Sequence, residues 1–338
     1  MKRFHMKNTM AFYIVLLLLP VICGFAALFV GRYPLPPSVV IQGLGAGLSL
    51  WQPPSIEAMT VLWQMRLPRV IAGVFVGSSL AVSGAAFQGV FRNPLVNSGI
   101  LGVSQGAGFG ASIAILMFAG GYFVYPFAFG FGVLAVFLSY LAGKIYSSVP
   151  GVTLILGGVI VSSFFGSLIM IVKYVADPYA QLPAITFWMM GSLASIGYSQ
   201  FAALLPMAAG MAAVFLVRWK INIISMGDKE ALTLGVDVSK YKLLIIGGAT
   251  LCTASAVCIS GIIGWVGLVA PHIGRMIVGN DNNRLIPFSM SFGACFLILV
   301  DVMSRSISGG EIPIGILTSL IGAPFFIYLL KKTRGGGW

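Results

Sequence analysis

The chain has 338 residues, of which 58% are hydrophobic and only 8% are charged. Soluble globular domains carry roughly 25% charged residues, so this composition excludes an ordinary soluble protein and indicates a polytopic membrane protein. The formal net charge of +12 does not indicate nucleic-acid binding, because the basic residues stand at the ends of apolar runs.

The first apolar run, Ala11–Val30, follows a basic start. A signal peptide has the same order of features, but the following Gly31-Arg32-Tyr33 does not match a small-residue cleavage site. The run has the roughly 20 residues that a helix needs to cross about 30 Å of hydrocarbon. We therefore interpret it as a retained first transmembrane helix.

Nine further apolar segments follow, so we expect an all-α membrane protein with about ten transmembrane helices in a single permease domain, residues 1–338. The segments are Arg69–Phe91, Ser98–Ala119, Tyr122–Ile145, Val152–Val175, Gln200–Val217, Tyr241–Ile262, Val266–Val278, Leu285–Met303 and Ile312–Leu330. The eighth of the ten, Val266–Val278, is too short to cross the bilayer unless it shares residues with its neighbour. A count of nine or ten therefore depends on Gly261–Gly264.

The distribution of lysine and arginine predicts the topology. With ten spans and a cytoplasmic N-terminus, fifteen of the twenty basic residues fall on the inner side. The positive-inside rule therefore predicts that both termini are cytoplasmic. The basic residues left outside are Arg32, Arg66, Arg69, Lys173 and Arg305.

Two glycine- and proline-broken segments have the same spacing of residues. Ser83-Gly84, Pro94 and Gly102 recur 177 residues later as Ser260-Gly261, Pro271 and Gly279. Interrupted apolar segments at corresponding positions of two halves are typical of transporters with internal repeats. Five helices in each half, about 1–198 and 199–338, would make the repeats inverted in the membrane.

Three polar segments interrupt the apolar pattern: two outer ones, Arg32–Gln64 and Ala176–Tyr198, and an inner one, Arg218–Lys240. Within the inner segment, residues 228–234 predict a short amphipathic helix. We expect Asp228 to cap its start and Gly235 to end it. Such a helix is either a docking site for a cytoplasmic partner or a surface segment that lies on the membrane.

Motifs for chemistry are missing from the sequence. There is no Gly-x4-Gly-Lys-Ser/Thr nucleotide loop, and Gly102-Val-Ser-Gln-Gly106 matches a nucleophile elbow only as a string within a glycine-rich membrane segment. The cysteines (Cys23, Cys252, Cys258 and Cys295) lie in apolar runs without metal-ligand spacing. We therefore expect no catalytic residue, no metal and no cofactor, and we expect that the chain is not an enzyme by itself.

The energy source is not evident in the sequence either. Ion-coupled transporters tend to place acidic residues or histidines inside the membrane. Asp301, four residues before Arg305, is the one carboxylate inside an apolar run. This favours a pump that is driven by a separate partner, while an ion-coupled secondary transporter and a passive channel stay open as alternatives.

Several stretches, spread over most of the chain, together resemble the motifs of one known protein family and follow one another in the order found in that family. They are residues 66–73 (RLPRVIAG), 83–89 (SGAAFQG), 92–95 (RNPL), 99–102 (GILG), 230–236 (EALTLGV), 267–275 (GLVAPHIGR), 310–315 (GEIPIG) and 320–327 (LIGAPFFI). Together they resemble the FecCD-type permeases of bacterial ABC importers for iron–siderophores, haem and cobalamin.

The resemblance implies a fold like that of the cobalamin-importer permease, in the plasma (inner) membrane of a bacterium. It further implies a homodimer that works with two cytoplasmic ATP-binding subunits and an external or periplasmic substrate-binding protein. The chain would contact the lipid bilayer, and no nucleic-acid partner is expected. Ferric siderophore, the commonest cargo of the family, is the expected cargo. Haem, cobalamin and molybdate stay open.

The resemblance also implies roles for single residues. Arg66, Arg69 and Arg305 match outer arginines that receive acidic residues of the binding protein, although contact with lipid headgroups is an alternative. Asp228, Glu230, Ala231, Leu232, Leu234 and Gly235 match the segment that seats in the ATPase, and Val152 and Thr153 lie at the inner gate of the pathway. Asn93, Pro94, Pro271, His272 and Arg275 belong to structural motifs.

One stretch departs from the family pattern. Family members often read Gly-x-Asp-His-Arg after the eighth helix, whereas this chain reads Gly279-Asn-Asp-Asn-Asn-Arg284. This puts in doubt any role for a histidine in that link.

Overall fold

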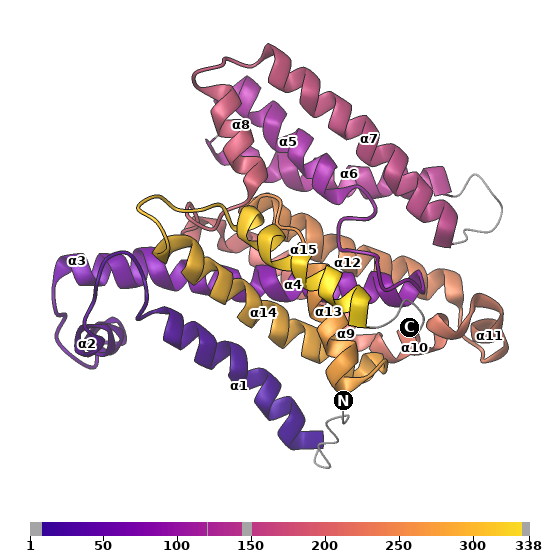
Figure 1. Cartoon of the computed structure of the whole chain (residues 1–338), viewed down its shortest axis with the longest axis horizontal. Coiled ribbons are helices and arrows are strands. Elements are labelled where there is room, and N and C mark those ends of the chain that lie inside the picture. The colour runs from indigo at the N-terminus through magenta and orange to yellow at the C-terminus, as the bar shows by residue number, and fades with distance from the viewer. Residues whose placement is uncertain (1–8, 120, 144–150, 333–338) are drawn as a thin grey trace.

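The computed structural model describes residues 9–119, 121–143 and 151–332, and the regular secondary structure over these ranges is helical. Each of the ten apolar segments contains a helix. These helices are α1 (Thr9–Ala27), α4 (Leu67–Val90), α5 (Val103–Phe118), α6 (Val124–Gly143), α7 (Gly151–Val175), α9 (Leu204–Leu216), α12 (Val238–Ser260), α13 (Val266–Val278), α14 (Asn282–Ser306) and α15 (Ile314–Lys332). The predicted all-helical, multi-span fold is confirmed (Figure 1).

The apolar helices differ in length. Within the described ranges, seven helical stretches are long and apolar enough to cross a membrane, whereas α5, α13 and the apolar part of α15 are shorter. The 13 residues of α13 extend only about 20 Å, less than the hydrocarbon core. Residues 261–264 are not helical, so α13 is a separate helix from α12.

Helix α4 is the centre of the packing. It runs lengthwise through the middle of the molecule and contacts α14, α12, α13 and α9 (Figure 1). Nearly all of its residues are buried, and many of them are glycine, alanine or serine. Small residues let helix backbones approach closely, which favours helix association where lipid removes the hydrophobic incentive.

Glycine pairs set the closest approaches of α4. A Cβ atom at Gly84 would overlap the carbonyl oxygen of Gly267 in α13, and one at Gly77 would overlap the carbonyl of Gly293 in α14. The Ser83 hydroxyl donates to the Ala249 carbonyl of α12 at 3.0 Å. Backbone contact and hydrogen bonds therefore fix α4 against three neighbouring helices.

Helices α5, α6 and α7 form a second group beside the α4 layer, with α8 (Gln181–Met190) at one end (Figure 1). Gly106 of α5 lies against the backbone of Phe131 in α6, and Gly157 of α7 lies against the carbonyl of Ser139. Contacts of α12 with α5 and α6 join this group to the rest of the molecule.

The polar segments contain more helix than predicted. The outer segment Arg32–Gln64 holds α2 (Pro37–Gly47), α3 (Ile56–Met59) and most of the π-helical η1 (Thr60–Arg66), which continues directly into α4. Two local signals explain the starts: Pro37 occupies the first position of α2, and the Ser55 hydroxyl caps α3 by accepting from the Ala58 amide. The second span therefore begins near Ile56, and the predicted start at Arg69 is too late.

Four further helical segments complete the described fold. The inner polar segment holds α10 (Arg218–Met226) and α11 (Asp228–Thr233). The short 3-10 helices η2 (Gly121–Phe123) and η3 (Tyr198–Ala203) precede α6 and α9.

The two ends of the long axis carry different elements. Helices α2 and α3 lie at one end, and α10 and α11 lie at the opposite end (Figure 1). The start of α1 and the end of α15 lie toward the α10–α11 end (Figure 1). The predicted topology requires both termini and the α10–α11 segment to lie at one end and α2 and α3 to lie at the other. The orientation of the chain in a membrane stays a prediction.

The repeated residues occupy different local structures. Gly84 lies inside α4, whereas Gly261 ends α12 with a φ of +67°. Gly102 precedes α5 and Gly279 follows α13, both with positive φ, of +83° and +85°. The inverted repeat therefore stays a prediction.

We predict that Gly84→Ala lowers thermal stability, because the added methyl group would push α4 away from Gly267. Overpacking in a well-packed core costs about 1–3 kcal/mol. Gly130→Ala in α6 is the matched control, since a Cβ there meets nothing within 4 Å. Detergent-solubilised protein would be unfolded thermally, and equal melting temperatures for the two variants would contradict the packing role of Gly84.

Candidate functional site

Two of the three predicted outer arginines pair with one buried carboxylate. Arg69 Nε lies 2.6 Å from Asp301 Oδ1, and Arg305 Nε lies 3.4 Å from Asp301 Oδ2. Arg66, the last residue of η1, precedes Arg69 by three residues and bonds to backbone carbonyls instead. Asp301 and Arg305, four residues apart on one helix, thus form an ion pair. Arg69 is a second partner that the sequence did not reveal.

The guanidinium groups of Arg66 and Arg305 also hold the end of α1. Arg66 Nη1 donates to the Leu28 carbonyl at 2.6 Å, and Arg305 Nη2 donates to the Ala27 carbonyl at 2.8 Å. The last carbonyls of a helix have no partner within the helix, and cations there are favoured by the helix dipole. These arginines thus tie α1 to α4 and α14.

A cavity of about 800 Å³ opens beside this cluster. Its lining includes the three arginines, Arg32 and Glu311. Arg69 Nη1 lies 2.8 Å from Glu311 Oε1. Arg66, Arg69 and Arg305 are each at most 7% exposed and are held by groups of their own chain, so they form the wall of the cavity and do not project from the surface.

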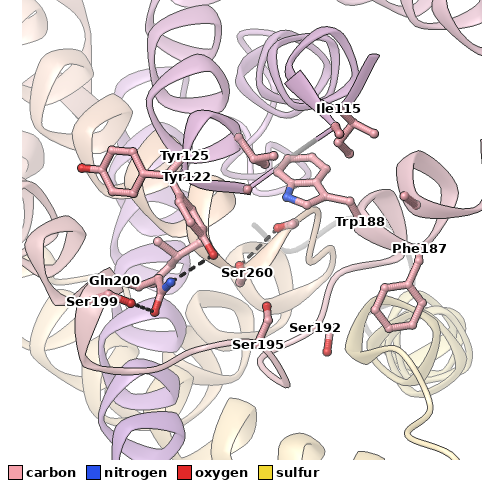
Figure 2. A pocket seen from close by; sticks show the side chains of 16 residues that line it. Ile115, Tyr122, Tyr125, Phe187, Trp188, Ser192, Ser195, Ser199, Gln200 and Ser260 are labelled. Atoms are coloured by element: carbon pink, nitrogen blue, oxygen red, sulfur yellow. Dashed lines mark hydrogen bonds between the residues drawn. The ribbon is translucent and has the colours of Figure 1, made fainter. Parts of the chain in front are cut away.

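A second cavity, of about 680 Å³, is neutral and lies between α5, α6, α8 and the end of α12. Figure 2 shows the rings of Trp188, Tyr122 and Tyr125 around it, together with several serine hydroxyl groups. Gln200 Nε2 donates to the Tyr125 hydroxyl at 3.1 Å. Ser195 lines both cavities, so a short segment of chain separates them.

The break between α12 and α13 forms one wall of the neutral cavity. Ser260 and Gly261 line it, and the Ser260 carbonyl accepts from the Ser192 amide at 2.8 Å. A Cβ at Gly261 would overlap the Trp188 carbonyl of α8. Irregular backbone at membrane depth is tolerated where it is buried in protein or lines a cavity, and this break does both.

The inner helix α11 confirms part of the prediction for residues 228–235. Gly235 follows the helix with a φ of +74°, and its amide donates to the Leu232 carbonyl at 3.0 Å. The predicted N-cap role of Asp228 is wrong, because Gly227 occupies the cap position. The carboxylate of Asp228 instead forms an ion pair of 2.6 Å with Lys242 of α12, which fixes α11 from the side.

The side chains of α11 divide into a buried and an exposed set. Ala231 is fully buried and packs with Val236 and Val238. Leu232 is 61% exposed, and Leu234 and Glu230 are exposed as well. Helix α11 thus presents two leucines and a carboxylate outward at the α10–α11 end of the molecule.

The predicted gate residues lie at the start of α7. Val152 is 69% exposed, and Thr153 is half-buried. The exposed face of α7 continues through Leu156, Ile160 and Phe164. Residues 144–150, which precede α7, lie outside the described part of the chain.

The residues of the predicted structural motifs form a hydrogen-bonded junction between α13, α4 and the α4–α5 link. Arg275 Nη2 donates to Gln88 Oε1 at 3.1 Å, and Gln88 Nε2 donates to the Val96 carbonyl at 3.2 Å. Asn93, which precedes Pro94, accepts from the Leu95 amide at 2.9 Å and so closes a turn. Gln88, which joins the two sides, was missed from the sequence.

The other two motif residues, Pro271 and His272, are buried in α13. The ring of His272 packs edge-on against Phe326 of α15, with 6.2 Å between the ring centroids. Its position fits a packed, structural histidine.

Comparison with known proteins gives the family. The family model of the FecCD transport family matches residues 17–332. The chain belongs to the FecCD transport family. The Molybdate import system permease protein MolB of Haemophilus influenzae is 39% identical over 95% of this chain and 96% of its own length. The Hemin transport system permease protein HmuU of Yersinia pestis is 34% identical over 85% of this chain and 88% of its own length.

A solved structure agrees over nearly the whole chain. It is described as an inward-facing conformation of a metal-chelate type ABC transporter, and it has a TM-score of 0.82 at 37% identity, covering 95% of this chain and 98% of its own. The FecCD protein is therefore the membrane permease of an ABC importer for metal chelates and is not itself catalytic. An ABC permease works with an ATPase and, in an importer, with a binding protein.

We predict that Asp301→Asn destabilises the FecCD protein more than Glu311→Gln. The side chain of Asp301 is 3% exposed and balances two buried guanidinium groups, whereas that of Glu311 is 34% exposed. Removing one partner of a buried pair costs about 3–5 kcal/mol, and an exposed pair contributes about 0–1 kcal/mol. Thermal unfolding in one detergent would compare the two variants, and a larger loss for Glu311→Gln would contradict this account.

Proposed function

We propose that this permease imports molybdate, which a binding protein delivers at the α2–α3 end and a cytoplasmic ATPase drives from the α10–α11 end. The observation that favours molybdate is the 39% identity, over nearly the full length of both chains, to a molybdate permease. Ferric siderophore, the expectation from the sequence, is the second candidate. A relative named as a probable iron chelatin permease, from Helicobacter pylori, is 37% identical over 81% of this chain.

The ATPase-docking role rests on α11. Leu232 and Glu230 point outward from this short helix, and the exposed Leu234 follows at its C-cap. Gly227 precedes the helix, Gly235 follows the cap, and the Asp228–Lys242 ion pair holds the helix against α12. A rigid helix with an exposed apolar side chain such as Leu232 is suited to a groove on a partner protein. The proposal includes a location in the bacterial inner membrane with both termini cytoplasmic, an orientation that the positive-inside count supports.

The binding protein would meet the arginine-lined cavity. Arg32, Arg66, Arg69 and Arg305 outnumber Asp301 and Glu311 there, so the mouth carries net positive charge. Complementary charge steers association and sets the register of docking. Association of the binding protein should therefore slow steeply with ionic strength, and an association rate that does not depend on salt would contradict this role.

A second copy of the chain would complete the pathway along α7 and α15. Both helices carry exposed apolar side chains, such as Val152 and Phe164 in α7 and Leu320 in α15. The inner gate at Val152 and Thr153 would then lie at the junction of the two copies. A cysteine at position 152 that gave no cross-link between copies, under conditions that cross-link other positions of α7, would count against this placement.

An ion-coupled mechanism has less support. Asp301, the candidate ion site in the sequence, is held by two arginines. A carboxylate that already has two cationic partners is poorly suited to bind sodium.

We predict that the double variant Glu230→Arg and Leu232→Arg abolishes copurification of the ATPase from native membranes. The two added cations would replace the exposed carboxylate and leucine of α11. The parent chain should recover a P-loop ATPase in mild detergent. The conservative pair Glu230→Gln and Leu232→Met is the control and should retain the ATPase. Recovery that is unchanged by the arginine pair would contradict docking on α11.

We predict that cells lacking this permease lose uptake of radiolabelled molybdate and regain it when the parent gene is supplied. Uptake of a ferric siderophore, measured in the same strains, should be unchanged. The opposite pattern would assign the ferric chelate as cargo and would contradict the molybdate proposal.

A further inference from the structure

Helix α10 joins α11 to the membrane helices. Its residues Ile221 and Ile224 are fully buried, and Ile221 lies directly over Gly89 of α4. Helix α10 also contacts α14. A displacement of α11 therefore reaches the body of the permease through α10.

One side chain of α10 is bonded to the start of α14. Asn222 Nδ2 donates to Asp281 Oδ1 at 2.7 Å. Asn222 Oδ1 accepts from both the backbone amide and the side-chain amide of Asn282, each at 2.8 Å. The donor and the acceptor of the Asn222 side-chain amide are thus both hydrogen-bonded, to the consecutive residues Asp281 and Asn282.

The bonded residues begin α14. Asp281 is its N-cap, and its carboxylate accepts from the Asn283 amide at 2.9 Å. Helix α14 then runs for 25 residues, about 37 Å, and its last turns carry Asp301 and Arg305 of the outer cluster. One helix therefore connects the Asn222 junction with the arginine-lined cavity.

Helix α11 has a second attachment, the Asp228–Lys242 ion pair to α12. A displacement of α11 is shared between α12, through this pair, and α14, through α10. Of the two routes, the one through Asn222 leads to the helix that ends at the predicted docking surface.

We infer that Asn222 is a positioning residue, which couples displacement of α11 by the ATPase to α14 and so to the outer cluster. The inference rests on the proposed docking of an ATPase at α11. The resemblance to the family gives Asn222 no role. Its partners lie in the stretch Gly279–Arg284, where Asp281 matches the family pattern and Asn282 departs from it.

The decisive variant is Asn222→Asp, which places two carboxylates face to face. Its reciprocal partner is the swap Asn222→Asp with Asp281→Asn. In the swap, the residue at 281 donates to the carboxylate at 222, and asparagine is as good an N-cap as aspartate. The swap therefore restores the hydrogen bond between positions 222 and 281 with the charge on the other side. In the parent chain Asp281 Oδ1 also accepts from Asn283, and in the swap the amide oxygen of residue 281 has to accept those bonds.

The readout is cargo transported per ATP hydrolysed, in proteoliposomes that hold the permease with its copurified ATPase and the loaded binding protein. We expect Asn222→Asp to lower this ratio about fivefold or more, the lower range of measured coupling factors, and the swap to restore most of it. A merely structural role would lower the amount of folded protein and leave the ratio unchanged. Ser225→Ala on the same helix is the control: it removes a hydrogen bond to the Asn222 backbone carbonyl, keeps the side-chain bonds of Asn222, and should keep the parent ratio.

The inference is overturned if Asn222→Asp keeps the parent ratio or if the swap is as impaired as Asn222→Asp alone. If Asn222→Asp does not fold, Asn222→Ala, which loses the donor and the acceptor without adding charge, replaces it, and a parent ratio in that variant overturns the inference. Failure of the parent chain to recover any ATPase is a separate outcome. It would remove the proposed function and the inference with it.

Discussion

The close packing of α4 on its neighbours is the constraint on which the rest of the structure depends. At Gly77 and Gly84 the α4 backbone lies directly against the backbones of α14 and α13, and a single methyl group at either position would overlap a carbonyl oxygen. In a bilayer, burial from water does not drive helices together. The close approach of the backbones instead stabilises their association through dispersion contacts. Helix α4 thereby fixes the positions of α13 and α14.

Polar groups then connect the fixed helices at both ends of the molecule. At one end, Asp301 joins Arg69 of α4 and Arg305 of α14, and the arginines hold the end of α1. At the other end, Asp281 and Asn282 receive Asn222 of α10. Helix α14 takes part in both junctions. The proposed coupling of an ATPase at one end to a binding protein at the other would use this connection.

The sequence predicted the apolar helices well, because most of them have a run of apolar residues close to the length of a span. It missed α2, α8 and α10, which are short helices in polar surroundings where the periodic signal is weak. Asp228 was expected to cap α11 from local spacing alone. Its actual partner, Lys242, lies fourteen residues further on, so a tertiary ion pair prevailed over the local cap. Arg69 and Asp301 are 232 residues apart, and no local pattern reveals such a pair. The comparisons placed the chain in the family that its motifs had indicated.

The most direct test of the account is uptake by proteoliposomes that contain the permease and its ATPase, with the loaded binding protein outside. The account predicts that cargo accumulates only when ATP is hydrolysed and the binding protein is present, and that dissipating proton and sodium gradients has no effect. Accumulation without ATP, or its collapse on addition of an ionophore, would contradict the ATP-driven mechanism.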